Sequence, residues 1–187
     1  MAEFPPNAKV VFEGVFFRVV QWEQKMYDGS TEIFERVWRP STTTVIAEQD
    51  GKIIMNRQSH PHRPESFLSC FGGVIEEGED PLGGAKRELL EESGLASDDW
   101  VSLGELPFGG RMEWITYFYI ARNCRKVAEQ NLDAGEKIEL LSVSPEEFLT
   151  KTIYLPDFRE RSLRQLLCDS SSEAMRESFM EKLRGKK

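Results

Sequence analysis

The chain has 187 residues, of which 40% are hydrophobic and 30% charged, the balance of a globular protein that can bury a core without disulfides or a structural metal. Its formal net charge of −8 argues against a nucleic-acid polymer as partner, because phosphate backbones are bound by clustered Lys and Arg. A small phosphorylated ligand is compatible with this charge.

Two antiparallel hairpins are predicted at the start of the chain, because turn residues separate extended, largely apolar stretches. The first hairpin joins residues 10–20 to residues 31–39 through the turn at residues 27–30. The second joins residues 42–47 to residues 52–57. The prolines that follow predict a loop, and the next extended stretch leads into a pair of glycines.

A helix is predicted to begin at Pro81 and to end at about Ser93. Asp80 is a good N-cap residue, and proline is favoured at the first helical position. Gly94 is placed to end the helix, because glycine readily adopts the left-handed conformation found there.

Strands and helices alternate in the rest of the chain, which predicts α/β or α+β layers. The Ser-rich segment at residues 169–173 separates the last two helices. The predicted strands are at residues 101–106, 114–122 and 137–143, and the predicted helices at 145–150, 160–167 and 174–183.

The cysteines and the N-terminus indicate the compartment. Cys70, Cys124 and Cys168 are scattered, odd in number and without C-x-x-C spacing, which disfavours a disulfide framework or a zinc site. The opening MAEFPPNAKV has no basic region followed by an apolar stretch, so no signal peptide is predicted. No apolar run approaches the roughly 18 residues of a membrane span. We expect a cytoplasmic protein with no membrane association.

The predicted helix carries an unusual group of acids. Residues three and four apart are neighbours on a helix, so Glu88, Glu91 and Glu92 share one face, which we expect to face solvent. Three neighbouring carboxylates repel one another, and a hard divalent cation would relieve the repulsion. Arg87 is one turn from Glu91 and could orient it, and Gly72 could offer a carbonyl ligand. A solvated helix face is the simpler alternative. The opposite, buried side is expected to carry Leu82, Ala85, Leu89 and Leu90.

Residues 73–95 resemble the Nudix box at every defined position: Gly, five residues, Glu, seven residues, then Arg-Glu-apolar-x-Glu-Glu-x-Gly-apolar. The resemblance implies a Nudix fold, a mixed β-sheet sandwiched between helices, with the box forming a loop–helix–loop. It also implies Mg²⁺, with Mn²⁺ possible, held by carboxylates of the box and the Gly72 carbonyl. The box residues are Gly73, Glu79, Arg87, Glu88, Glu91, Glu92 and Gly94, of which Glu88, Glu91 and Glu92 are the implied metal ligands and Arg87 and Glu91 candidate catalytic residues.

The first hairpin resembles the equivalent stretch of ADP-ribose and nucleoside-diphosphate-sugar pyrophosphatases. In that branch an Asp-Gly turn precedes a strand with an aromatic-Glu pair and a later Arg. The resemblance implies that Phe34 stacks on the base, Glu35 accepts a hydrogen bond from the base and Arg39 binds phosphate. Phe16 or Phe17 would be the second stacking partner. The alternative is a strand in which Phe34 is simply buried.

The loop before residue 137 resembles the acidic loop of the same branch. The resemblance implies that Glu136 positions or deprotonates the attacking water, with Glu139 and Glu113 as other candidates. A surface loop with several acids needs no function, which is the simpler alternative.

A second basic candidate comes from the strand at residues 52–57. Arg57 corresponds to the Arg or Lys of an Arg/Lys-Gln pair in this branch and is taken as substrate-binding. Whether His60, His62 or Arg63 contacts phosphate is left open.

Together these resemblances imply divalent-metal-dependent hydrolysis of the pyrophosphate bond in a nucleoside diphosphate linked to a further group. ADP-ribose or a nucleotide sugar is expected, giving a nucleoside monophosphate and a sugar phosphate. A Nudix enzyme acting on nucleoside triphosphates or dinucleotide polyphosphates is the first alternative. A nucleotide-sensing regulator with a Nudix fold is the second, and the intact box argues against it.

Residues 10–22 are apolar on both faces, more than a half-solvated hairpin should show. Coverage by the chain's own domain is one explanation; a partner subunit is the other, and twofold dimers are the commonest closed assembly. The resemblance favours the dimer, because N-terminal strands exchange between subunits in this branch. We therefore expect a homodimer with an N-terminal β-hairpin region at residues 1–40 (dimerisation and base pocket), a Nudix catalytic domain at 41–155 and a C-terminal helical tail at 156–187.

Overall fold

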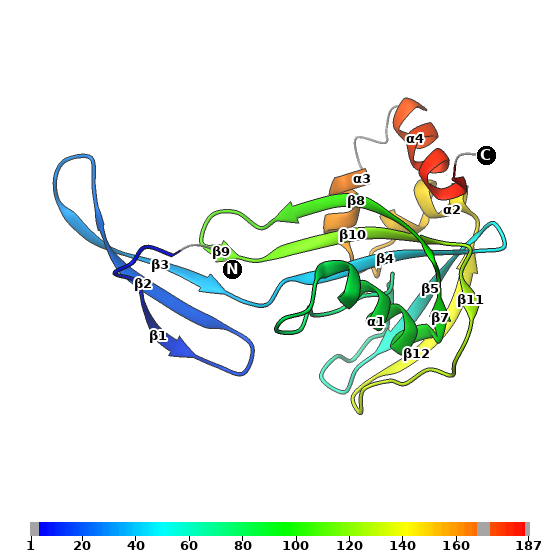
Figure 1. Cartoon of the computed structure of the whole chain (residues 1–187), viewed down its shortest axis with the longest axis horizontal. Helices are drawn as coiled ribbons and strands as arrows, with labels where there is room; N and C mark the ends of the chain where they lie inside the picture. Colours follow the sequence, from blue (N-terminus) through cyan, green and yellow to red (C-terminus); the bar gives the residue numbers. More distant parts are fainter. Residues whose placement is uncertain (1–3, 168–172, 186–187) are drawn as a thin grey trace.

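A mixed β-sheet forms the centre of the molecule in a computed structural model that describes residues 4–167 and 173–185 (Figure 1). Its order is β12–β5–β4–β10–β8, with β6 beside β5, and only β4 and β10 run parallel among these pairs. The strands are β4 (Thr42–Gln49), β5 (Lys52–Ser59), β6 (Phe67–Ser69), β8 (Asp99–Pro107), β10 (Ile115–Arg122) and β12 (Lys137–Val143).

Helices cover both faces of this sheet, as predicted. Successive strand residues point to opposite faces, so Val45 and Ala47 pack under α1 (Pro81–Ser93), whereas Ile46 packs on the other face. That second face is covered by α2 (Pro145–Thr150), α3 (Arg161–Leu167) and α4 (Glu173–Arg184). Large side chains such as Phe118 and Phe148 are fully buried there, and each stabilises the fold by about 1.5–3 kcal/mol.

A second sheet at the N-terminus stands apart from the central one in Figure 1. Its order is β1–β2–β3–β9, with β9 parallel to β3. The strands are β1 (Lys9–Glu13), β2 (Arg18–Lys25), β3 (Thr31–Trp38) and β9 (Met112–Glu113).

The first predicted hairpin is corrected by this sheet. Residues 10–20 do not form one strand, because the chain turns after Glu13, where the backbone N–H of Gly14 donates to the carbonyl of Phe17 at 2.8 Å. The strand that pairs with β3 is therefore β2, which places Trp22 opposite Phe34.

The other predicted elements agree closely with the structure. β12 and α2 begin and end at the predicted residues, and α3 and α4 lie within one residue of their predicted bounds. Most of the Ser-rich segment and Cys168 lie outside the described residues. The unpredicted elements are short: β7 (Leu95–Ala96), β9, β11 (Arg125–Lys126) and the 3₁₀ turn η1 (Thr152–Tyr154).

Two further observations bear on earlier expectations. Leu90 was expected on the buried side of α1, but its side chain is 39% exposed, whereas Ala85 and Leu89 are fully buried. Within the described ranges, no helix has the length and apolar character needed to cross a membrane.

Candidate active site

The caps of α1 fix the position of its acids. The Asp80 side chain accepts hydrogen bonds from the backbone N–H groups of Leu82 and Gly83, both at 3.0 Å. At the other end Gly94 adopts the left-handed conformation with φ 67°. The predicted N-cap and stop are confirmed, and the 13 residues of the helix hold Glu88, Glu91 and Glu92 three and four positions apart.

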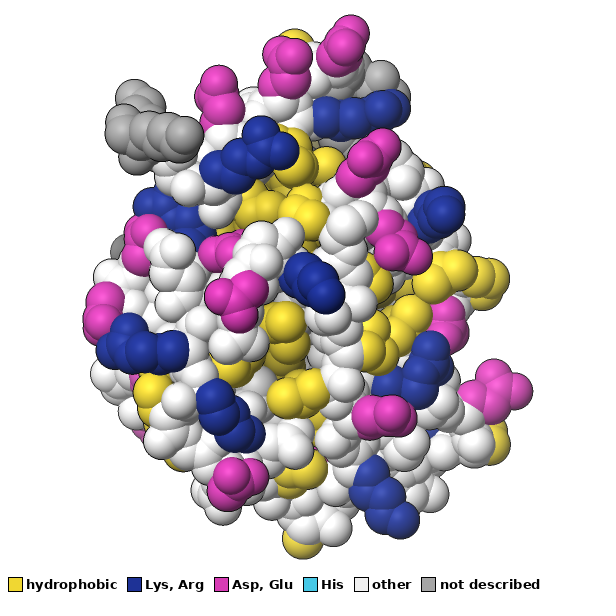
Figure 2. All heavy atoms as spheres, turned by 90° about the vertical axis from the view of Figure 1, so that its right-hand side faces the viewer, with side chains coloured by type: hydrophobic (Ala, Val, Ile, Leu, Met, Phe, Trp, Pro, Cys, Tyr) yellow, Lys and Arg dark blue, Asp and Glu magenta, His cyan; other side chains and the backbone are white. Residues whose placement is uncertain are grey.

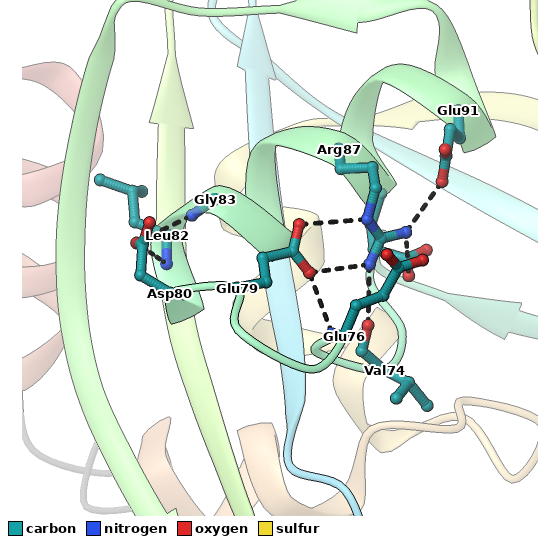
Figure 3. Close-up of polar contacts among 9 residues, drawn as sticks. Val74, Glu76, Glu79, Asp80, Leu82, Gly83, Arg87 and Glu91 are labelled. Atoms are coloured by element: carbon teal, nitrogen blue, oxygen red, sulfur yellow. Dashed lines mark hydrogen bonds and ion pairs between the residues drawn. The ribbon is translucent and has the colours of Figure 1, made fainter.

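Arg87 ties this helix to the loop that precedes it (Figure 3). Its guanidinium donates to Glu79 at 3.2 Å, to Glu88 and Glu91 at 2.9 Å, and to the carbonyl of Val74 at 2.8 Å. Burial alone would lower the pKa of Arg87, but the hydrogen bond to Glu79 and the charge of Glu88 outweigh it and raise that pKa. The same hydrogen bond lowers the pKa of Glu79. Arg87 therefore stays charged and orients both acids.

Glu92 does not face solvent, contrary to the expectation from helix spacing. Its side chain lies 4% exposed beneath the loop, and each carboxylate oxygen accepts a hydrogen bond. Gln58 Nε2 donates to one oxygen at 2.9 Å and the backbone N–H of Gly72 donates to the other at 3.0 Å. Burial raises the pKa of Glu92 well above its ordinary value, and burial raises the pKa of Glu88 as well.

The glycine pair before the helix allows the loop to lie against these acids. Gly72 has φ 138°, and a Cβ there would lie 2.1 Å from the carbonyl oxygen of Thr43. A Cβ on Gly73 would lie 2.4 Å from Glu88 Oε1. Neither position can hold a side chain without displacing backbone or a box carboxylate.

The box acids Glu88, Glu91 and Glu92 line a cavity of about 480 Å³. Glu136, the expected base, lies in this cavity together with Glu88, Glu91 and Glu92, and its charge adds to the rise in the pKa of Glu88 and Glu92.

The other two candidate bases lie outside the lining of this cavity. Glu113 is ion-paired with Arg36. Glu139 is an exposed residue of β12 opposite Arg57.

The donor set suits a hard divalent ion, which prefers carboxylate and carbonyl oxygens. In the described part of the chain, no three His, Cys, Asp or Glu side chains are gathered closely enough to hold an ion as they stand. Arg87 Nη1 donates to one oxygen of Glu88 and to one oxygen of Glu91.

A second cavity of about 690 Å³ shares Glu76 with the first and lies beside the N-terminal sheet. Arg39 and Phe16 both line it, and the guanidinium carbon of Arg39 lies 4.4 Å from the ring centre of Phe16. The same carbon lies 4.3 Å from the ring centre of Trp114, which also stacks on Phe108 at 3.9 Å. Sequence reasoning missed Trp114, which no motif indicated.

Three predicted substrate-binding residues lie outside the lining of both cavities. Phe34 packs against Trp22 with ring centres 5.1 Å apart. Glu35 accepts a hydrogen bond from Gln21 at 3.0 Å. Arg57 forms an ion pair with Asp157 at 3.1 Å. Their predicted contacts with substrate therefore stay predictions.

Sequence reasoning also missed Gln58 and Arg159, which line the first cavity. Gln58 was noted only as the neighbour of Arg57. Arg159 lies just beyond the predicted catalytic domain at residues 41–155. Backbone pairing with β6 brings it to the cavity: the N–H of Arg159 donates to the carbonyl of Leu68 at 2.9 Å.

Comparisons with known proteins agree with this geometry. The NUDIX domain family matches residues 37–166. The methanol dehydrogenase activator of Bacillus methanolicus is 29% identical over 144 residues, which cover 74% of this chain and 77% of that protein. The ADP-ribose pyrophosphatase of Bacillus subtilis (strain 168) is 27% identical over 142 residues, with the same two coverages of 74% and 77%.

A solved structure described as the crystal structure of ADP compounds hydrolase matches with a TM-score of 0.72. At 20% identity, and covering 89% of this chain and 91% of that one, it shows a shared fold. The resemblance inferred from the box is thereby confirmed. Since the NUDIX match spans more than half of the 187 residues and contains the whole box, the chain belongs to the Nudix family and is one of its pyrophosphohydrolases.

Proposed function

We propose that this protein hydrolyses the pyrophosphate bond of a nucleoside diphosphate linked to a further group, with ADP-ribose or a nucleotide sugar as substrate. The products are a nucleoside monophosphate and a sugar phosphate. The observation that carries the proposal is the cavity in which the box acids meet Glu136 and three arginines. The similarity to a protein named ADP-ribose pyrophosphatase supports the substrate class.

The proposal includes a requirement for Mg²⁺, with Mn²⁺ as a substitute. Glu88, Glu91 and Glu92 would hold the ion together with the carbonyl of Gly72. When bound, a divalent ion supplies positive charge against the phosphates, where negative charge builds in the transition state. Arg87 keeps Glu88 and Glu91 on the cavity side of the helix by its hydrogen bonds.

Glu136 is the proposed general base. It lies in the loop before β12 and lines the same cavity as the box acids, so a water between them could pass its proton to this carboxylate. The water then attacks one phosphorus in line, and the bond to the bridging oxygen breaks. The buried Glu92 cannot take this role as readily, because both of its oxygens already accept hydrogen bonds.

The second cavity is the proposed site for the nucleoside. Phe16 is the proposed stacking partner of the base. Arg39 lies between the rings of Phe16 and Trp114 with its charge available to a phosphate. Among the described residues, no carboxylate forms an ion pair with Arg39. Phe34 and Glu35 would reach a base from a partner subunit.

We further propose that the protein is a cytoplasmic homodimer joined through the N-terminal sheet. All five residues of β1 are exposed in the single chain, although three of them are large and apolar. Phe12 is 56% exposed and Ile33, on β3, is 63% exposed. Burying these side chains between two copies would remove apolar surface from water.

The surface supports a small-molecule substrate over a nucleic-acid polymer. On the face shown in Figure 2, acidic and basic side chains are interspersed. A polyanion is bound by a concentration of Lys and Arg on one face. The net charge of −8 points in the same direction.

A substrate panel tests the proposal. With Mg²⁺ or Mn²⁺ we expect AMP and ribose phosphate from ADP-ribose at a kcat/KM well above that for nucleoside triphosphates or dinucleotide polyphosphates. A faster reaction that releases pyrophosphate from a triphosphate would favour the alternative enzyme. Failure to hydrolyse any of these compounds would favour the nucleotide-sensing regulator.

A further inference from the structure

The lining of the first cavity carries groups of opposite charge. It includes the box acids and Glu136, and also Arg63 and Arg159. Neither of these two arginines forms an ion pair with a carboxylate in the described part of the chain. Two guanidinium groups that share a cavity and have no carboxylate in direct contact repel each other, and an anion between them would relieve that repulsion.

A single aromatic ring holds both guanidinium groups in place. Phe67 is buried in β6, and the guanidinium carbon of Arg63 lies 4.5 Å from its ring centre. The guanidinium carbon of Arg159 lies 5.2 Å from the same centre. The His60 ring stacks on Phe67 with ring centres 5.5 Å apart. Stacking on an aromatic face restrains a guanidinium while leaving its N–H edges able to bind an anion.

Arg159 is also fixed by its own backbone and by Gln58. The backbone N–H of Arg159 donates to the carbonyl of Leu68, and Arg159 Nη1 lies 3.5 Å from the side-chain amide oxygen of Gln58. The neighbouring Glu160 does not neutralise it by direct contact, because its two oxygens accept from the Ser69 hydroxyl and the Cys70 N–H. Gln58 in turn donates to Glu92, so one buried amide connects Arg159 to a box acid.

Arg57 provides the contrast. It stands one residue before Gln58, but its guanidinium is already ion-paired with Asp157 and bonded to Ser66. A second anion would have to compete with Asp157 for it. Arg63 and Arg159 lie in the cavity and have no such competitor among the described residues.

We propose that Arg63 and Arg159, stacked on Phe67, form a phosphate-binding subsite in the cavity of the box acids. The subsite binds the phosphate that bears the non-nucleoside group. After hydrolysis this phosphate is part of the sugar phosphate product. The identity of the ligand as a sugar phosphate rests on the proposed function. The prediction that the subsite binds phosphate does not depend on it. Planar guanidinium groups match phosphate oxygens in paired hydrogen bonds.

The position of Arg159 relative to Arg39 supports this orientation. Burial lowers the pKa of Arg39, and the charge of Arg159 lowers it further, so the two arginines lie within electrostatic range of each other. Arg39 lines the proposed nucleoside cavity, and Arg159 lines the cavity of the box acids. The two cavities share Glu76, so a substrate could extend from one cavity into the other.

Calorimetric titration of inorganic phosphate into the folded protein, with and without Mg²⁺, tests the subsite directly. Arg159→Gln and Arg63→Gln should each weaken phosphate binding by roughly 5- to 20-fold, because each removes a charge-assisted hydrogen bond. Arg125→Gln is the matched control: this arginine is ion-paired with Asp98 and lines neither cavity, so the variant should change the affinity less than twofold. The same two variants should raise the inhibition constant of ribose 5-phosphate more than that of AMP.

The outcomes separate the subsite from the proposed function. Phosphate binding that depends on Arg63 and Arg159 in a protein that hydrolyses no nucleotide would keep the subsite and overturn the proposed function. Hydrolysis of ADP-ribose with wild-type phosphate affinity in both variants would overturn the subsite, as would an equal loss in Arg125→Gln. Thermal melting identifies misfolded variants, and Arg63→Gln, in an exposed loop, gives a second test if Arg159→Gln does not fold.

Discussion

Glu91 and Glu92 are neighbours in the chain but have different surroundings. Glu92 is buried, and an amide there would place its NH₂ group against a donor, either the Gly72 N–H or the Gln58 amide. The side chain of Glu91 is 38% exposed and has Arg87 as its hydrogen-bond donor. Replacement of Glu92 therefore disturbs packing together with charge, whereas replacement of Glu91 changes charge with little effect on packing.

Glu91→Gln is for this reason the sharper test of the metal site. We expect turnover to fall by about 100-fold or more at saturating Mg²⁺, because charge stabilisation at phosphorus is the main catalytic contribution. The melting temperature without metal should stay close to that of the wild type. Steady-state kinetics over a range of Mg²⁺ concentrations measures the effect, and Glu177→Gln, at an exposed position of α4 that lines neither cavity, is the control. A near-normal rate would remove Glu91 from the set of ligands.

Helix spacing predicted which acids share a face of α1, but it could not predict their depth. The spacing of Glu88, Glu91 and Glu92 follows from helix geometry alone. The burial of Glu92 comes from Gln58 and Gly72, which are distant in sequence and reach it only in the folded chain. The same reason explains why Arg159 was missed, since its place depends on pairing with β6.

The segment between η1 and α3 acts as an extra edge of the sheet beside β6. Leu68 accepts from the N–H of Arg159 and donates its own N–H to the carbonyl of Asp157, both within 3.0 Å. Glu160 completes this contact: the Ser69 hydroxyl donates to it at 2.6 Å and the Cys70 N–H at 3.1 Å. This element therefore positions both Arg159 and the strand that leads into Gly72.

Glu160 makes the stability of this element dependent on pH. Burial raises the pKa of Glu160, so its carboxyl group stabilises the fold fully only below its ordinary pKa, and that contribution is lost as the pH rises through the raised value. In Glu160→Gln the amide can accept from Cys70 and donate to the Ser69 oxygen. We expect this variant to be more stable to urea than the wild type at pH 8, and the difference to vanish towards about pH 4.

Urea unfolding at several pH values measures this difference. Glu65→Gln, which changes an exposed carboxylate, should leave the unfolding curves unchanged and is the control. A Glu160→Gln variant that is less stable than the wild type at pH 8 would mean that the fold uses the charge, for example to attract Arg159.

Element boundaries could be predicted where local chemistry decides them. α2 begins as predicted because the Ser144 side chain caps it and Pro145 occupies its first position. The break between β1 and β2 had a weaker signal, because Gly14 stands among large apolar residues that continue on both sides of the turn. Pairing with β2 and β3 decides the register there, and pairing is not a local property.

At the scale of the whole molecule, the exposed apolar side chains of the N-terminal sheet are the feature that a single chain does not explain. Figure 1 shows this sheet projecting from the central domain, and its exposed apolar side chains lie on β1, β3 and the turn between β1 and β2. Val15, in that turn, is fully exposed. A second copy packed on this surface would cover these groups and bring Phe34 and Glu35 to the partner's nucleoside cavity.

Light scattering at micromolar concentration should therefore give about twice the chain mass of 21.5 kDa. Phe12→Glu should dissociate the dimer, because its 56% exposed side chain tolerates a charge in one chain but not in an apolar interface. Val127→Glu, at a similarly exposed site on the central domain (51%), should leave the mass unchanged. Truncation before Thr42 should abolish both dimerisation and activity. A mass near 21.5 kDa with full activity would exclude a shared pocket.

Phosphorus NMR of ADP-ribose incubated with the full-length protein tests the central claim most directly. With Mg²⁺ present, we predict that the diphosphate resonances are replaced by the two phosphomonoester resonances of AMP and ribose phosphate. Excess chelator should stop the reaction, and added Mg²⁺ should restore it. Diphosphate resonances that persist with Mg²⁺ present, or that disappear equally fast in excess chelator, would contradict the account of a metal-dependent hydrolase of nucleoside diphosphates linked to a further group.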